Sequence, residues 1–282
     1  MVASLGGIPM EWIVDLVGPG VAQAMQVDAI LYDGRSAFQR IQVAASRLFG
    51  RMLVLDDAIQ TTERDEYTYH EMLVHLPVVT HPSPRRALII GGGDGGTLEE
   101  SLKHPLEHVT MVEIDRDVVE VCRRFLPGIS GAAFDDPRTR LLVEDGIAYV
   151  RTARERFDVI LVDSTDPKGP GVALFSQEFY AACATLLSDD GLLVAQSGSL
   201  LYQRDLIEMV RHHLHAVFPI VGTYWAPVPA YPGVLWSFSY GSKRFDPGRV
   251  AGDTIRHRLT SVQTRFYGPA THAAGLQLPA LL

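Results

Sequence analysis

Two acidic residues, Asp163 and Asp166, follow a run of apolar β-forming residues, and the loop that holds them contains Pro167 and Pro170. Two carboxylates on a stiff loop can bind a cationic amine and remove a proton from it. An aliphatic ammonium has a pKa of about 10, as lysine does, and becomes a nucleophile only after losing that proton. The pair therefore predicts amine chemistry. A local turn, a helix cap supplied by Asp166, or a Mg²⁺ site are the alternatives.

A glycine-rich loop supplies a third acid. Residues 86–90 form a short apolar run that predicts a buried strand, and a helix-forming segment follows the loop. Gly91, Gly93 and Gly96 match the dinucleotide-binding spacing, in which missing Cβ atoms let a ligand lie against the backbone at a helix N-terminus. Asp94 lies inside this loop, and two like charges at ~4 Å repel by about 4 kcal/mol at an effective dielectric of about 20. The loop therefore favours a cationic nucleoside without a carboxylate over a pyrophosphate.

Acids also end or follow the next two predicted strands. Glu113 lies 22 residues after Gly91 (113 minus 91), close to the spacing of an acid that accepts hydrogen bonds from ribose hydroxyls. Asp145 suits an adenine edge, because its carboxylate can accept from the exocyclic amine and Gly146 leaves room for the ring; a purely local Asp-Gly turn is the alternative. Ligands in such sheets bind beyond the carboxyl ends of the strands, so we expect these acids to share one site with Asp163.

The segments that must position these acids alternate between strand and helix patterns. Strands are expected at 86–90, 109–114, 140–143, 157–162 and 191–195, and helices at 97–102, 117–125, 146–153, 177–187 and 205–217. Two further β-like runs follow at 220–224 and 235–240. This alternation predicts a Rossmann-like, doubly wound, mostly parallel sheet that ends in an antiparallel pair.

The N-terminal part has a different pattern. Short β-like runs at 37–43, 51–55 and 58–62 predict a small antiparallel β domain, while a short helix is predicted at 21–25. A helix is expected from Tyr67 to Leu76, with Pro77, Pro82 and Pro84 marking the passage to the glycine-loop strand. We therefore expect an N-terminal β-strand domain over residues 1–66 and a Rossmann-like domain with a C-terminal extension over residues 67–282.

The composition limits the class of protein. Of 282 residues, 47% are hydrophobic and 21% are charged, which is typical of a soluble globular chain, and the formal net charge of −8 disfavours nucleic acid or an anionic membrane as the main partner. Cys122 and Cys183 have no metal or redox spacing, so we expect buried thiols in a reducing cytoplasm. Glu11 and Asp15 interrupt the apolar N-terminus and no basic run precedes it, so neither a signal peptide nor a membrane span is predicted.

Four stretches closely resemble the polyamine aminopropyltransferases, the spermidine synthases: residues 60–72 (QTTERDEYTYHEM), 89–96 (IIGGGDGG), 111–115 (MVEID) and 162–170 (VDSTDPKGP). The resemblance extends from about Ser36 to Lys243, and residues 267–279 resemble the family's C-terminal stretch. It implies transfer of the aminopropyl group of decarboxylated S-adenosylmethionine, a co-substrate, to a diamine, usually putrescine, which gives spermidine and methylthioadenosine. It also implies an N-terminal β domain on a Rossmann-like domain, a homodimer or homotetramer, and no metal or resident cofactor.

Carried over residue by residue, the resemblance implies that Asp163 is the catalytic base. Around the nucleoside it places Gln39, Glu113, Asp145, Gly146 and Pro170, beside the glycine loop with Gly91 and Gly93. Along the amine path it places Tyr69, His70, Asp166 and Tyr231, with Asp94 at the aminopropyl end. Ordinary S-adenosylmethionine would be disfavoured, because its carboxylate would lie against Asp94.

Several positions depart from the family pattern, and those at Lys168 and residues 230–234 border the amine path. Phe38 replaces a tyrosine, Asp56-Asp57 replaces Asp-Gly, Lys168 replaces a small apolar residue, and residues 230–234 (AYPGV) replace Thr-Tyr-Pro-Ser-Gly. The sequence therefore leaves the identity of the amine acceptor open, and cadaverine, agmatine and spermidine are alternatives to putrescine. An N-methyltransferase that uses intact S-adenosylmethionine, a non-enzymatic binding protein and a dehydrogenase are weaker alternatives, because Asp94 and the set of acids oppose them.

Overall fold

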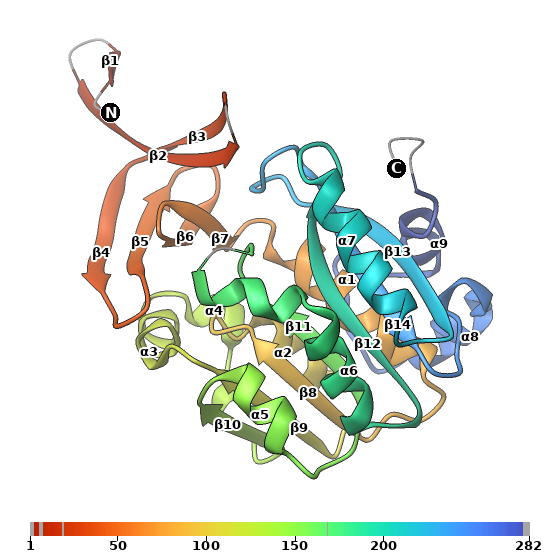
Figure 1. Cartoon of the computed structure of the whole chain (residues 1–282). Coiled ribbons are helices and arrows are strands. Elements are labelled where there is room, and N and C mark those ends of the chain that lie inside the picture. The colour runs from red at the N-terminus through yellow and green to blue at the C-terminus, as the bar shows by residue number, and fades with distance from the viewer. Residues whose placement is uncertain (1–2, 6–7, 19, 168, 279–282) are drawn as a thin grey trace.

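The computed structural model describes residues 3–5, 8–18, 20–167 and 169–278. Its N-terminal part forms two small antiparallel sheets, drawn in red and orange in Figure 1. The first has the order β1 (Ala3–Leu5), β2 (Ile8–Gly18) and β3 (Val21–Val27). The second has the order β4 (Ala29–Arg35), β5 (Arg40–Ser46), β6 (Gly50–Leu55) and β7 (Ala58–Thr62). The expected N-terminal antiparallel β structure is therefore confirmed.

Two details of the N-terminal prediction are wrong. Residues 21–25 belong to strand β3, which pairs with β2, because Met25 and Val27 face a core while the residue between them is exposed. This period of two is typical of a strand, and backbone pairing with β2 overrides a weak local helix preference. The strand expected from residue 37 begins only at Arg40, since the Ser36 hydroxyl accepts from the backbone N–H groups of Phe38 and Gln39 and so closes a turn.

The third sheet is the centre of the molecule. Its strands are β8 (Arg86–Gly91), β9 (His108–Glu113), β10 (Thr139–Val143), β11 (Phe157–Asp163), β12 (Leu187–Ser199), β13 (Ile220–Pro227) and β14 (Leu235–Ser242), in the order β10-β9-β8-β11-β12-β14-β13. Neighbouring strands pair in parallel along the series β10, β9, β8, β11 and β12. Strand β14 pairs antiparallel with both of its neighbours, β12 and β13. This is the predicted doubly wound, mostly parallel sheet with an antiparallel pair at one end.

Helices cover both faces of the central sheet (Figure 1). Ala87 and Ile89 of β8 face one core with α1 (Glu66–Thr80) and α2 (Gly96–Leu102). Leu88 and Ile90 face the opposite core, which contains residues of α5 (Gly146–Thr152), α6 (Gln177–Leu186) and α7 (Arg204–His215). A strand that is buried on both faces has a continuous run of apolar residues, and residues 87–90 (ALII) show this pattern.

The second N-terminal sheet packs on the rest of the chain through α3 (Arg116–Phe125) and α4 (Pro127–Ser130). Ile41 and Leu53 of the second sheet share one buried cluster with Val118 and Cys122 of α3. Cys122 and Cys183, in α3 and α6, are free and buried, as expected. The remaining helical elements are η1 (Ala133–Asp135), η2 (Gly169–Phe175), η3 (Pro247–Arg249), α8 (Gly252–Arg258) and α9 (Pro269–Gly275).

Helix α1 is longer than the sequence indicates. It continues to Thr80 with Pro77 inside it, so the expectation that Pro77 ends the helix is wrong. Every residue from 68 to 80 is buried, and the Pro77 carbonyl still accepts from the N–H of His81. Packing of the whole segment therefore outweighs the backbone hydrogen bond that proline cannot donate. Within the described ranges, none of the helices combines the length and apolar character needed to cross a bilayer.

Candidate active site

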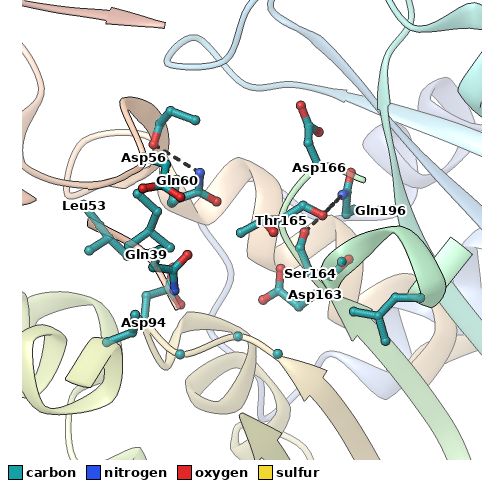
Figure 2. A pocket seen from close by; sticks show the side chains of 18 of the residues that line it. Gln39, Leu53, Asp56, Gln60, Asp94, Asp163, Ser164, Thr165, Asp166 and Gln196 are labelled. Atoms are coloured by element: carbon teal, nitrogen blue, oxygen red, sulfur yellow. Dashed lines mark hydrogen bonds between the residues drawn. The ribbon is translucent and has the colours of Figure 1, made fainter. Parts of the chain in front are cut away.

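A cavity of about 400 Å³ lies between the carboxyl ends of β8, β9 and β11 and the two N-terminal sheets. Figure 2 shows Gln39, Leu53 and Gln60 on one side of it and the stretch from Asp163 to Asp166 on the other. All the predicted site residues except Pro170 line this cavity. The backbone of Pro170 lies in η2, and its side chain is outside the described part of the chain. Lys168 is wholly outside the described part. The strand-end acids therefore converge, as the topology predicts.

The glycine loop brings two of these acids together. Gly91 and Gly92 have φ angles of +85° and +74°, a region that side-chain-bearing residues rarely adopt. A Cβ atom at Gly91 would collide with the backbone carbonyl oxygen of Asp163, and that same oxygen accepts from the Gly92 N–H at 2.9 Å. The loop is thus held against the end of β11, which places Asp94 beside Asp163.

Both oxygens of the Asp163 carboxylate accept hydrogen bonds from hydroxyl groups. The Tyr69 hydroxyl donates to Oδ1 at 2.7 Å, and the Thr97 hydroxyl donates to Oδ2 at 2.6 Å. Burial raises the pKa of Asp163 and the neighbouring Asp94 carboxylate raises it further, while His70 and the two hydroxyls lower it in part; the net direction is upward. A carboxylate with a raised pKa is a better proton acceptor near neutral pH.

His70 lies between two carboxylates. Its Nδ1 is 2.9 Å from Glu66 Oε2, and its Nε2 is 3.5 Å from Asp94 Oδ2. Asp94 is fixed by its other oxygen, which accepts from the Gly96 N–H at 2.8 Å. Burial lowers the pKa of His70, but Asp94 and Glu66 outweigh it, so the pKa is well above its ordinary value. The imidazole therefore partly neutralises the acids at this end of the cavity.

The other end of the cavity has the residues predicted for a nucleoside. Glu113 ends β9, and its Oε1 accepts from the Asp115 N–H at 2.9 Å; burial raises its pKa to about 7. Gln39 donates to Asp115 Oδ2 at 2.9 Å and so spans the boundary between the N-terminal sheet and α3. Asp145 caps α5 by accepting from the Ile147 N–H at 2.8 Å, so it has the local structural role that was the alternative to adenine binding. Asp145 also lines the cavity.

The loop after β11 extends the cavity toward the predicted amine path. Gln203 donates to Asp166 Oδ2 at 3.1 Å, so Asp166 is held at the cavity wall. The idea that Asp166 caps the following helix is wrong, because the Ser176 hydroxyl accepts from the Phe179 N–H at the start of α6. The ring of Tyr231 meets that of Tyr69 edge to face at 5.6 Å, and its hydroxyl donates to the Gln60 carbonyl oxygen.

Several residues of the site were not predicted. Asp15 of β2 is buried and lines the cavity, and one of its oxygens accepts from the Ile59 N–H at 3.2 Å. An isolated acid in an apolar stretch was its only signal. Thr97 could have been found as the first hydroxyl after the glycine loop. Three glutamines that line the cavity come from separate elements, and no sequence pattern assigns them a role: Gln60, Gln196 and Gln203.

Three clusters among the described residues bring histidine and carboxylate atoms within 4.8 Å of one another. Two lie outside the cavity lining: Glu71, His75 and Glu100, and His81, Asp158 and Asp190. The third consists of His70, Asp94 and Asp163 and faces the cavity. Hydroxyl and backbone donors already orient its carboxylates, and the remaining oxygen lone pairs suit an alkyl ammonium group.

Comparisons with known proteins agree with this geometry. The chain matches the model of the spermine/spermidine synthase domain over residues 66–248 and that of the spermidine synthase tetramerisation domain over residues 11–63. It is 44% identical to a polyamine aminopropyltransferase of Desulforudis audaxviator over 272 residues, covering 96% of this chain and 97% of the relative. It is 39% identical to one of Bacillus subtilis over 269 residues, covering 95% and 96%.

Solved structures give the same result. A spermidine synthase in complex with the transition-state analogue AdoDATO aligns with a TM-score of 0.92 and 36% identity, covering 99% of this chain and 94% of that one. The spermidine synthase of Thermotoga maritima aligns with a TM-score of 0.90 and 37% identity, covering 95% and 91%. The chain therefore belongs to the spermine/spermidine synthase family, the polyamine aminopropyltransferases.

Proposed function

We propose that the enzyme transfers the aminopropyl group of decarboxylated S-adenosylmethionine to putrescine, with Asp163 as the general base, and releases spermidine and methylthioadenosine. The main support is the position of the Asp163 carboxylate, which lines the cavity beside Asp94 and is held by two hydroxyl donors. A group so held can accept a proton from an amine without reorienting. A related spermidine synthase binds a transition-state analogue, which agrees with a transfer reaction in this cavity.

The co-substrate is assigned from the charges of the cavity. Decarboxylated S-adenosylmethionine has a sulfonium and an ammonium group and no carboxylate. Its aminopropyl ammonium would pair with Asp94, while Glu113 would accept from the ribose hydroxyls and Gly91 and Gly93 would let the nucleoside lie against the backbone. In the same proposal Gln39, Asp145, Gly146 and Pro170 surround the nucleoside. The carboxylate of ordinary S-adenosylmethionine would face Asp94, which disfavours a methyltransferase.

The proposed reaction is a single in-line displacement. Asp163 takes a proton from the attacking ammonium of putrescine, and the freed nitrogen lone pair forms a bond to the aminopropyl carbon next to the sulfonium. The carbon–sulfur bond breaks, its electron pair returns to sulfur, and methylthioadenosine leaves as a neutral thioether. The protein contributes position and acidic surroundings rather than a covalent intermediate. Tyr69, His70 and Tyr231 would line the amine path.

The acceptor proposal depends on the far end of the cavity. A diamine carries a second ammonium, which needs a carboxylate at a distance from Asp163. Asp166 and Asp15 both line the cavity and could receive it, and the side chains of Gln60, Gln196 and Gln203 line the same cavity. Cadaverine, agmatine and spermidine differ from putrescine in length or in the charged end group, so this part of the cavity decides between them.

The test is methylthioadenosine release from decarboxylated S-adenosylmethionine, with putrescine, cadaverine, agmatine and spermidine offered separately. We expect turnover with putrescine to exceed that with the other three. Preference for another amine would replace the acceptor and leave the transfer reaction in place. No turnover with any of the four, or methyl transfer from ordinary S-adenosylmethionine, would contradict the proposal.

The organisation of the chain is proposed on separate grounds. The two family models meet between residues 63 and 66, which supports an N-terminal domain of residues 1–66 and a catalytic domain of residues 67–282. The match to a tetramerisation domain supports a homotetramer, with a homodimer as the alternative. Two buried, unpaired cysteines support a reducing, cytoplasmic location.

A further inference from the structure

His70 lies between two carboxylates, each of which faces one of its ring nitrogens. The side chain is 2% exposed, its Nδ1 faces Glu66 Oε2 at 2.9 Å, and its Nε2 faces Asp94 Oδ2 at 3.5 Å. A neutral imidazole has one donor nitrogen and one acceptor nitrogen, so it can donate to only one of these carboxylates. The imidazolium donates to both. The arrangement therefore fits a protonated His70 that serves as the counter-ion of Asp94.

Glu66 is held in place by a second contact, made by the carboxylate oxygen that does not face His70. Its Oε1 pairs with Arg265 Nη1 at 3.2 Å, and the Arg265 guanidinium lies 3.7 Å from the centre of the Tyr67 ring. The His70 ring is confined as well, because a Cβ atom at Gly96 would collide with it. Glu66 and His70 are thus a fixed pair. Asp94, which lines the cavity, is the partner that an entering ligand can reach.

The charged groups around His70 come from every element packed against it. Burial opposes the imidazolium, but Asp94 and then Glu66 raise the pKa of His70 well above its ordinary value. Three more acids and two cations lie in the same network: Asp163 of β11, Glu99 and Glu100 of α2, Lys103, which pairs with both of these glutamates, and Arg265 of the C-terminal segment. The balance is acidic, so the imidazole holds its proton at neutral pH while the cavity is empty.

A ligand ammonium changes that balance. An aliphatic ammonium keeps its proton at neutral pH, since its pKa is about 10. At Asp94 it would stand close to His70, and two like charges at ~4 Å repel by about 4 kcal/mol at an effective dielectric of about 20. The ligand cation then satisfies Asp94, and His70 can release its proton to solvent while Glu66 stays in contact with Nδ1.

We infer that His70 and a ligand ammonium exchange at Asp94, so that binding of the cationic co-substrate releases one proton from His70 while binding of the neutral product does not. This rests on the proposed function, because it takes the ligand ammonium to be the aminopropyl end of decarboxylated S-adenosylmethionine. The exchange distinguishes co-substrate from product by charge. It favours the co-substrate at higher pH, where the proton is released at lower cost.

Two other acids could release protons and need separate controls. Glu113 has a pKa of about 7 and lies at the proposed nucleoside end, so it can lose a proton on binding of either ligand, and more readily beside the co-substrate's sulfonium than beside neutral methylthioadenosine; Glu113→Gln removes this contribution. The informative quantity is the difference in proton release between these two ligands. Asp163 also has a raised pKa and faces Asp94, so its contribution must be removed by substitution.

The experiment is isothermal titration of the full-length enzyme at pH 7.5 in two buffers with different ionisation enthalpies. For each ligand, the difference between the two buffers gives the number of protons released on binding. The ligands are decarboxylated S-adenosylmethionine and methylthioadenosine, and no amine acceptor is present. We expect the co-substrate to release up to one more proton per site, and the ratio of the two affinities to change by up to tenfold per pH unit. The difference is expected to persist in Asp163→Asn and in Glu113→Gln, and to vanish in His70→Gln.

Each other outcome has a defined meaning. Equal proton release for both ligands, in an enzyme that turns over, would overturn the inference and leave the proposed function intact. A difference that survives in His70→Gln and disappears in Asp163→Asn or in Glu113→Gln would assign the proton to that carboxyl group and also overturn the inference. Failure of the co-substrate to bind would overturn the proposed function together with the inference. Should His70→Gln not fold, Glu66→Gln replaces it, with a smaller difference expected because one of the two carboxylates is gone.

Discussion

The Tyr69 hydroxyl donates to the Asp163 carboxylate at 2.7 Å, across a sequence separation of 94 residues. Tyr69 lies on α1 and Asp163 ends β11, so the hydrogen bond joins a helix that covers the central sheet to the sheet itself. It favours the charged form of Asp163 against the effect of burial. The bond therefore sets both the orientation and the basicity of the proposed base.

Replacing Tyr69 by phenylalanine should lower kcat/KM by about tenfold, because a hydrogen bond to a charged group contributes roughly 1.5 kcal/mol or more. Loss of that bond raises the pKa of Asp163 further, and the base works only when it is deprotonated. The acid limb of the pH profile should therefore move to higher pH. The measurement is kcat/KM against pH, with Tyr202→Phe, a half-exposed tyrosine outside the cavity lining, as the matched control. An unchanged acid limb would contradict the assigned role.

Replacing Asp163 by asparagine should reduce kcat by about 10²- to 10⁴-fold, the usual contribution of a general base. Methylthioadenosine affinity should remain near that of the wild type, because the amide keeps the shape of the side chain and this ligand has no amine to deprotonate. Steady-state turnover and direct binding give the two values. Asp189→Asn changes an exposed acid in the same way and should have no effect. Comparable turnover in Asp163→Asn would exclude it as the base.

Much of the fold could be predicted because each strand of the central sheet is a local pattern. Residues 87–90 are apolar on both faces, and Asp94, Glu113, Asp145 and Asp163 follow from the rule that ligands bind at the carboxyl ends of parallel strands. These positions needed only the order of elements along the chain. Their convergence on one cavity follows from the parallel pairing.

Contacts between distant segments could not be predicted in the same way. Asp15 reaches the cavity because β2 packs against β7, and Gln203 reaches Asp166 across 37 residues. Strand β3 was mistaken for a helix because its stability comes from pairing with β2, which leaves only a weak local pattern. Pro77 was mistaken for a helix end because the burial that keeps α1 continuous is a tertiary property.

The raised pKa of Glu113, about 7, predicts pH-dependent nucleoside binding. The charged carboxylate accepts hydrogen bonds from two ribose hydroxyls better than the protonated acid does, so methylthioadenosine affinity should fall as the pH drops through 7. Glu113→Gln should weaken binding by about 10- to 100-fold, the range for hydrogen bonds to a charged group, and remove this pH dependence. Titration calorimetry at several pH values measures both effects.

The matched control for that variant is Glu144→Gln, an exposed acid at the end of the neighbouring strand β10. It should bind methylthioadenosine as the wild type does, with the same pH dependence. The KM for the amine should stay unchanged in both variants, because Glu113 lies at the proposed nucleoside end of the cavity. A larger effect on the amine KM than on nucleoside affinity would contradict the assignment of Glu113.

The close approach of the glycine loop to β11 predicts a specific cost for Gly91→Ala. The left-handed backbone, with φ of +85°, costs an alanine about 1–2 kcal/mol, and the collision of its Cβ with the Asp163 carbonyl adds a further loss. We expect about 3 kcal/mol or more of destabilisation in total, together with loss of turnover because Asp163 is displaced. Gly20→Ala separates the two effects, since Gly20 has φ of +81° and no atom within 4 Å of an added Cβ. It should lose only about 1–2 kcal/mol in urea unfolding, so equal losses in the two variants would show that the collision contributes nothing.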